Sequence, residues 1–379
     1  MKKIILIVVT FVILTTLSTT VVFADGNGDT NDSGALTFDL SELYNSLSDE
    51  VRQSLTNIGL TAADGNQISA LSFDSVINEV KSLAADNMSS PLKGLLNITA
   101  LLLLCSILSA YKNTLSSDVS TVLNITSTLC VTCAVAMPAI SVINATSGVI
   151  SASSNVMLAY IPVMAVAMAS SGHPISGASY YSVMIAAGEG VGQLSSRIIV
   201  PFLNMFLGLS ITSSVSPDIN LSGFTAIISK LIKWLLGFAM TIFTALLSFR
   251  QLITTSLDNV STRAVRFTLN SFIPIVGSAL SDAYKTVESS IGLLKSGVGI
   301  FVIISVAFVF LPVILQCLMW ILTLWIGKST AEVLSLTGVT KLLDSITAVF
   351  STLLAILLCI MSVYIISTAL VLMIGGGGS

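Results

Sequence analysis

The chain has 379 residues, of which 54% are hydrophobic and 9% are charged, and its formal net charge is −3. A soluble domain carries about 25% charged residues, so this composition excludes a soluble protein and indicates an integral membrane protein. The acidic residues concentrate between residues 25 and 93, whereas the remainder of the chain is mildly basic. Nucleic-acid binding is not expected, because it requires a basic patch.

Residues 1–24 have the pattern of an export signal. Two lysines follow the first methionine, an apolar run comes next, and small residues end the segment at Ala24. We expect cleavage after Ala24, and an uncleaved first span is the alternative. In both cases residues 25–93 are predicted to form an exported acidic helical segment. Its apolar stripe from Leu36 to Leu55 is too short for a large core, so we expect it to dock on a partner or on the membrane body.

Residues 94–374 are predicted to form an all-α polytopic membrane domain with about 6–8 transmembrane helices, some of them broken or re-entrant. An uncharged Ser/Asn/Thr-rich stretch is expected to be an external turn between the second and third spans, with Lys112 inside. Trp320 and Trp325 are expected to anchor one span at the interface. Residues 375–379, GGGGS, resemble a cloning linker, and a native glycine-rich end is the alternative. The apolar runs cover residues 95–111, 119–143, 156–169, 198–215, 234–249, 298–326 and 346–374.

The stretch 272–280 is a candidate functional element because it is apolar but too short to span. Nine helical residues rise about 14 Å, roughly half of the hydrocarbon thickness. Pro274 disfavours a continuous helix and Gly277 permits unusual backbone angles. Two interpretations are open: a broken or re-entrant element inside the protein, or a loop between interfacial helices. Polar residues that border this stretch complete the candidate element: Arg263, Arg266, Asn270 and Asp282.

Pro162 joins the candidates through a possible internal repeat. Pro162 and Pro201 are separated by nearly the same length of chain as Pro274 and Pro312. Broken segments at corresponding places in two halves are typical of transporter sites, although eight prolines make chance matches common. The alternative is therefore that no repeat exists.

Glu189 lies in the apolar stretch 178–192, where an ionisable residue is a functional candidate by default. The favoured alternative places it at the interface, paired with Arg197.

No residues for catalysis, cofactor binding or metal binding are predicted. His173 has no neighbouring ligand residue, and no phosphate-binding loop, nucleophile elbow or dinucleotide fingerprint occurs. Cys130 and Cys133 have the spacing of a redox motif but lie in an apolar run, so we expect them to be small packing residues of a span. An enzyme is not expected.

The signal-like start, the acidic exported segment, the multispan body and the stretch LNSFIPIVGSALSD at residues 269–282 resemble the stage III sporulation protein AE family of endospore-forming bacteria. The resemblance implies a multi-pass protein of the mother-cell membrane around the forespore, with its exported segment in the space between the two membranes. It also implies, as partners, the proteins of the same operon and a forespore-membrane protein, together forming a channel-like complex required for forespore development. No catalytic residue is carried over. A stand-alone secondary transporter for a small solute and a scaffold without a conduction path are the alternatives.

Overall fold

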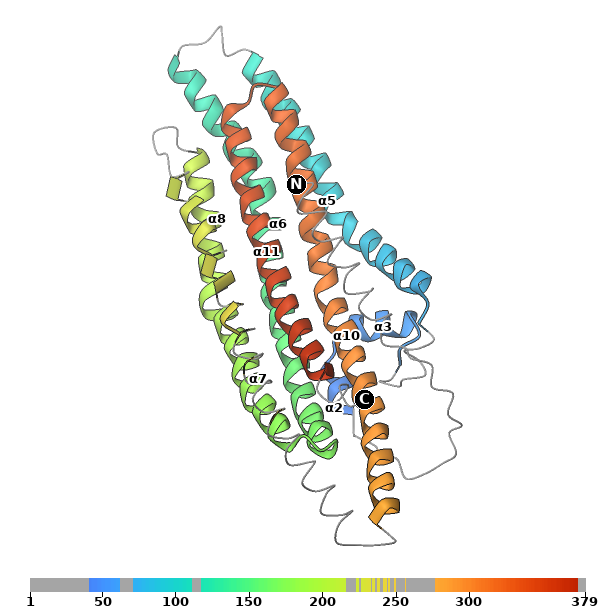
Figure 1. Cartoon of the computed structure of the whole chain (residues 1–379). Coiled ribbons are helices and arrows are strands. Elements are labelled where there is room, and N and C mark those ends of the chain that lie inside the picture. Colours follow the sequence, from blue (N-terminus) through green and yellow to red (C-terminus); the bar gives the residue numbers. More distant parts are fainter. Residues whose placement is uncertain are drawn as a thin grey trace. The chain divides into compact units, whose positions relative to one another are not determined.

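The structure is a computed structural model that describes residues 41–61, 71–110, 117–215 and 277–373, together with separate residues between 223 and 256. The all-α prediction is confirmed, because the elements of this part are helices only (Figure 1). They are α2 (Ser41–Asn45), α3 (Asp49–Asn57), α5 (Phe73–Ala110), α6 (Ser117–Ser170), α7 (Pro174–Leu194), the π-helical turn η2 (Ser195–Ile199), α8 (Val200–Val215), α10 (Gly277–Val333) and α11 (Thr337–Met373).

Among the described residues, five helical segments are long and apolar enough to cross a membrane. Helices α6 and α10 have 54 and 57 residues, respectively. At 1.5 Å per residue each extends for about 80 Å, more than twice the roughly 30 Å of a hydrocarbon core. A bilayer therefore covers only part of either helix. The five segments are Phe73–Ala110, Thr121–Ser170, Arg197–Val215, Gly297–Val333 and Thr337–Ala369.

Helix α6 corrects the prediction of two spans joined by an external turn. The Ser/Asn/Thr-rich stretch continues the helix, with Pro138 and Pro162 inside it. Its hydroxyls bond back to the preceding turn: Thr146 Oγ1 donates to the Val142 carbonyl at 2.8 Å, and Ser153 Oγ to the Ile150 carbonyl at 2.8 Å. Such bonds satisfy polar side chains without ending a helix. The predicted topology, with this turn outside and Lys112 inside, is therefore no longer supported by a turn.

Helix α5 runs without a break from the predicted exported segment, residues 25–93, into the predicted span at residues 95–111. Pro91 lies inside the helix and is buried. Proline removes one backbone donor, so the carbonyl of Asn87, four residues earlier, loses its helical hydrogen bond. Separately, Thr323 Oγ1 of α10 donates to the Pro91 carbonyl at 3.3 Å, which joins α10 to this part of α5. Three residues farther on, a Cβ at Gly94 would overlap the Trp320 indole, so α5 and α10 cross closely.

The π-helical turn η2 joins α7 to α8 without a loop. Pro201 follows in the first turn of α8 and offers no N–H to the carbonyl of Arg197, four residues earlier. A wider turn at this point gives the proline ring room. The predicted span at residues 198–215 is confirmed as an apolar helical segment, Arg197–Val215.

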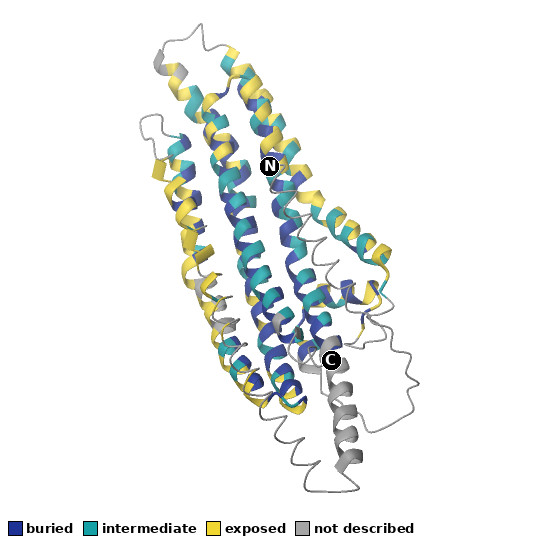
Figure 2. Ribbon diagram, in the orientation of Figure 1, coloured by how far each residue is buried: buried dark blue, intermediate teal, exposed yellow. Residues whose placement is uncertain are grey.

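Helices α10 and α11 form the hairpin at the centre of the packing. α10 contacts α5, α6 and α11, and α11 contacts α6 and α8. Their residues are mostly buried or half-buried, in contrast to the exposed outer surface of α8 (Figure 2). Trp320 of α10 stacks on Phe350 of α11 with ring centroids 6.0 Å apart. Trp320 is 1% exposed, so its prediction as an interfacial anchor was wrong, whereas Trp325 is exposed.

The helices α2 and α3 dock on this body through the predicted leucine stripe. Leu43, Leu47 and Leu55 are each at most 2% exposed, and the helices contact α5, α6 and α10. Asn57 Nδ2 donates to Glu79 Oε2 of α5 at 3.0 Å, which fixes the end of α3. Docking on the membrane body, one of the two predicted outcomes, is thus confirmed.

Three helices end in the same C-capping motif, in which a residue with positive φ turns the chain. The positive-φ residues are Gly59 after α3, Gly172 after α6 and Ser335 after α10, with φ of 90°, 83° and 57°. In each case the next residue donates its N–H to the carbonyl five residues back, as Leu336 does to the Ala331 carbonyl at 2.9 Å. This is the Schellman arrangement, which glycine fits without steric cost.

Ser335→Gly is therefore expected to stabilise the α10–α11 hairpin. A serine in this conformation has a Cβ close to its own backbone, and glycine removes that contact at some entropic cost in the unfolded chain. We expect a net gain of about 0.5–1 kcal/mol, visible as a higher thermal midpoint in detergent. Ser335→Val should lower the midpoint, and equal midpoints for both variants would contradict this account.

Candidate functional sites

Hydroxyl groups gather between α6, α7 and α11 in the buried interior. Ser154 Oγ and the Tyr364 hydroxyl share a hydrogen bond of 2.8 Å, and Ser367 Oγ donates to Met184 Sδ at 2.9 Å. These residues are buried, and they come from positions up to 210 residues apart. We call this group the hydroxyl cluster: Ser154, Tyr160, Tyr180, Met184, Tyr364, Ser367 and Thr368.

Two tyrosines of the hydroxyl cluster are buried with unsatisfied hydroxyls. Tyr160 is 0% and Tyr180 5% exposed, and neither hydroxyl has a hydrogen-bond partner among the described residues. Thr368 lies beside Tyr160 and Ser367 beside Tyr180, each close enough for a weak interaction with the phenol oxygen, but neither contact has the geometry of a hydrogen bond. A buried polar group without a partner costs about 1–3 kcal/mol, so native proteins contain few of them.

The chemistry of the hydroxyl cluster is hydrogen bonding without charge. Hydroxyls donate and accept, so they fix the register of packed helices and bind small polar molecules. The cluster has no acid, base or thiol that would activate a hydroxyl as a nucleophile. Sequence reasoning missed it, although the signal was present: three tyrosines, Tyr160, Tyr180 and Tyr364, lie inside apolar runs, where a phenol hydroxyl requires a partner.

Two tyrosine substitutions should therefore differ in their effects. Tyr364→Phe leaves the Ser154 hydroxyl buried without its partner and should cost about 1–2 kcal/mol. Tyr160→Phe removes a hydroxyl that has no partner and should be neutral or slightly stabilising. The measurement is the thermal midpoint of the purified protein in detergent, at matched membrane abundance. If Tyr160→Phe lowers the midpoint as much as Tyr364→Phe does, the Tyr160 hydroxyl has a hydrogen-bond partner after all and this account is wrong.

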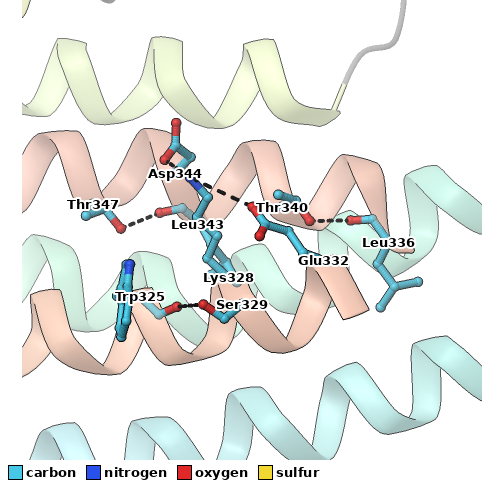
Figure 3. A network of polar contacts seen from close by, with 9 residues as sticks. All are labelled: Trp325, Lys328, Ser329, Glu332, Leu336, Thr340, Leu343, Asp344 and Thr347. Carbon is cyan, nitrogen blue, oxygen red and sulfur yellow. Dashed lines mark hydrogen bonds and ion pairs between the residues drawn. The ribbon is translucent and has the colours of Figure 1, made fainter. Parts of the chain in front are cut away.

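A second polar group lies at the α10–α11 turn (Figure 3). Lys328 of α10 pairs with Asp344 of α11 and, at 4.0 Å, with Glu332. The two carboxylate side chains are 65% and 55% exposed, and exposed ion pairs contribute only about 0–1 kcal/mol. Trp325 lies one turn before Lys328 and is exposed. A tryptophan next to charged residues is typical of a membrane–water interface, so the prediction of Trp325 as an interfacial anchor stays open.

The sequence-predicted candidates do not come together among the described residues. Pro162 is an exposed residue inside continuous α6. Gly277 begins α10 and Asp282 follows in it, so the last residues of the stretch 272–280 are helical and continue into the next span without a break. Glu189 lies in α7, and its side chain is outside the description. Four candidates lie outside the described residues: Arg263, Arg266, Asn270 and Pro274.

The cysteine pair of α6 corrects another prediction. Cys130 and Cys133 are exposed on the outer face of the helix, whereas packing inside the span was expected. Their spacing of three places both on one helical face. Within the described ranges, no group of three His, Cys, Asp or Glu residues is arranged to hold a metal ion.

Fold and sites together define an all-α membrane protein whose buried interface carries uncharged hydroxyl groups. The family model described as stage III sporulation protein AE matches residues 60–376, and the chain belongs to this family. The resemblance noted from the sequence is thereby confirmed, and with it a role in sporulation. The stage III sporulation protein AE of Bacillus subtilis (strain 168) is 28% identical over 158 residues, which are 42% of this chain and 40% of that protein. The match thus spans less than half of that relative. No solved structure matches the chain.

Proposed function

We propose that the protein is a membrane component of a channel-like or secretion-like complex in the mother-cell membrane around the forespore, and that forespore development requires it. The observation that carries this proposal is the family match over residues 60–376. The five apolar helical segments support residence in a membrane. In this proposal the protein crosses that membrane several times and acts as an assembly subunit, without catalysis and without a cofactor.

The proposal places residues 25–93 in the space between the two membranes. There they would reach the other proteins of the operon and the forespore-membrane partner. The docking of α2 and α3 supports this role, because their apolar side is covered by the body of the protein. Their remaining surface is polar and includes the exposed residues Asp49, Glu50 and Gln53. A polar acidic surface held in one place suits contact with a partner protein outside the membrane.

Spore formation tests the proposal. Cells lacking the gene should complete engulfment and then fail to form heat-resistant spores, and the intact gene should restore them. Pro274→Ala and Gly277→Leu test the candidate element at 272–280 in the same assay. Gly208→Leu is the matched control, since a side chain at this glycine meets nothing within 4 Å. Normal spore yield in the deletion would overturn the proposal.

A stand-alone secondary transporter is the second candidate, and the hydroxyl cluster is the observation that favours it. Buried hydroxyls between helices bind small polar solutes in such proteins. Purified protein in liposomes would then transport a solute without any other component. Glu189→Gln would reduce that transport if the carboxylate couples it to protons. We expect no transport by the protein alone.

A further inference from the structure

Helix α7 is held on the described body of the protein mainly by α6. Its neighbour α8 packs on both α6 and α11, whereas the contact of α7 with α11 is small. A hydrogen bond between these two helices runs from Ser367 Oγ of α11 to Met184 Sδ of α7, at 2.9 Å. A thioether sulfur is a weak hydrogen-bond acceptor, so this bond contributes little to holding α7 against α11.

The hydroxyl cluster disfavours the closed position of α7, by which we mean its position in this structure. Tyr160 of α6 and Tyr180 of α7 are almost fully buried, and their hydroxyls have no hydrogen-bond partner in the described part of the chain. The two phenol groups are close enough to interact electrostatically. Burying a hydroxyl without a partner has a cost in free energy that hydration of the same group removes. Separation of α7 from α11 would expose both hydroxyls to water and recover this cost.

The end of α7 has the composition of a joint. Gly188, Gly190 and Gly192 lie in its last turns, and the π-helical turn η2 follows directly. Glycine weakens the interior of a helix relative to alanine, and π-helical turns frequently occur at functional sites. A Cβ at Gly190 would meet no atom within 4 Å, so packing does not require a glycine there. The last turns of α7 are therefore the part of this helix that bends most easily.

The start of α7, in contrast, is fixed on α6. A Cβ at Gly177 would lie 2.7 Å from the Ala165 carbonyl oxygen, so the two helices approach closely there. The Gly177 N–H also donates to the His173 carbonyl at 2.9 Å, which continues the helix directly from the turn after α6. A movement of α7 must therefore keep its start in place and displace the residues beyond it, including Tyr180 and Met184.

We propose that α7 is a movable helix and that its separation from α11 opens the hydroxyl cluster to water. The weak bond to Met184, the unpartnered phenol hydroxyls and the glycine-rich end are independent observations, and each favours this movement. In the open position the cluster offers water, or another small uncharged molecule, hydroxyls that donate and accept hydrogen bonds. The movement is independent of the proposed assembly role, and any solute that reaches the cluster requires it.

The rate at which a buried thiol reacts with a charged methanethiosulfonate reagent measures this opening. The full-length protein is purified in detergent, with the five native cysteines replaced by alanine and Thr368→Cys introduced as the probe. Thr368 is 1% exposed, and its hydroxyl donates to the Tyr364 carbonyl of the same helix. A protein that keeps Cys317 alone is the control, since Cys317 is 0% exposed in α10, outside the hydroxyl cluster.

We expect the Thr368→Cys thiol to react while Cys317 stays protected. Adding Tyr180→Phe should slow the reaction about fivefold or more, because the closed position then no longer buries an unhydrated hydroxyl. Adding Gly190→Ala should slow it by a similar factor, because alanine strengthens the last turns of α7. Gly208→Ala is the matched control and should leave the rate unchanged, since this glycine of α8 also has open space around it.

Protection of the Thr368→Cys thiol from the charged reagent would overturn the proposal. Equal reaction of Cys317 would do the same, because both thiols would then be exposed by unfolding of the whole protein. An unchanged rate in either Tyr180→Phe or Gly190→Ala would also overturn it, since the phenol hydroxyl or the glycine-rich end would then not control the opening. A thermal midpoint no lower than that of the parent protein verifies that each variant is folded.

Discussion

Gly94→Leu should strongly destabilise the crossing of α5 and α10. A Cβ at this position already overlaps the Trp320 indole, and that indole is itself fixed by stacking on Phe350. The larger side chain must separate α5 from α10, and overpacking of this kind costs about 3 kcal/mol. The separation would also break the hydrogen bond from Thr323 to the Pro91 carbonyl. We expect a lower thermal midpoint in detergent and a lower abundance in membranes.

Two variants check the cause of this effect. Gly208→Leu introduces the same side chain at an exposed helical glycine with open space around it, and it should change stability little. Trp320→Leu removes the obstructing ring. Gly94→Leu should therefore lower the thermal midpoint less in the Trp320→Leu background than in the native protein. Purely additive effects of the two substitutions would show that Gly94 and Trp320 do not interact.

Leu55→Asp should release α3 from the body of the protein. Leu55 is 0% exposed, and α3 contacts both α5 and α10. A carboxylate cannot remain charged at an apolar contact without a large cost in free energy, so the helix should leave its site instead. We expect protease to cut residues 41–61 at least tenfold faster, while the remaining helices stay protected.

Gln53→Asp is the control for this release, because it adds the same charge at an exposed position of α3. It should leave the rate of proteolysis nearly unchanged. If Leu55→Asp is cut no faster than the control, the docking of α3 does not depend on its leucine stripe. If the whole chain becomes sensitive, α3 is required for folding of the body.

Hydrophobicity was sufficient to predict the class of the fold but not the ends of its helices. The runs that became α10 and α11 contain few polar residues, so they were recognised directly. The middle of α6 is different, because serine and threonine hydroxyls find hydrogen-bond partners equally well in a turn or on the preceding turn of a helix. Contacts with other helices decide between these outcomes, and such contacts are not visible in a local pattern. The same applies to α5, where Thr323 lies 232 residues from the Pro91 carbonyl that it contacts.

The candidate sites depended even more on tertiary structure. Ser154 and Tyr364 come together only because α6 and α11 pack in one register, which no spacing in the sequence encodes. The stretch 272–280 was predicted from Pro274 and Gly277 to be either a broken element or a loop between interfacial helices. Gly277 is the first residue of α10, and Pro274 lies outside the described residues, so the choice between these two interpretations stays a prediction.

The length of α6 and α10 has a consequence for imaging the purified protein. A detergent micelle replaces the bilayer only around the apolar belt, about 30 Å of helices that extend for about 80 Å. The rest of the bundle must project from the micelle as ordered protein. Small membrane proteins are difficult to align in electron micrographs because the micelle hides them. Here the projecting helices would themselves supply an asymmetric landmark, so particle orientations should be assignable without an added antibody fragment.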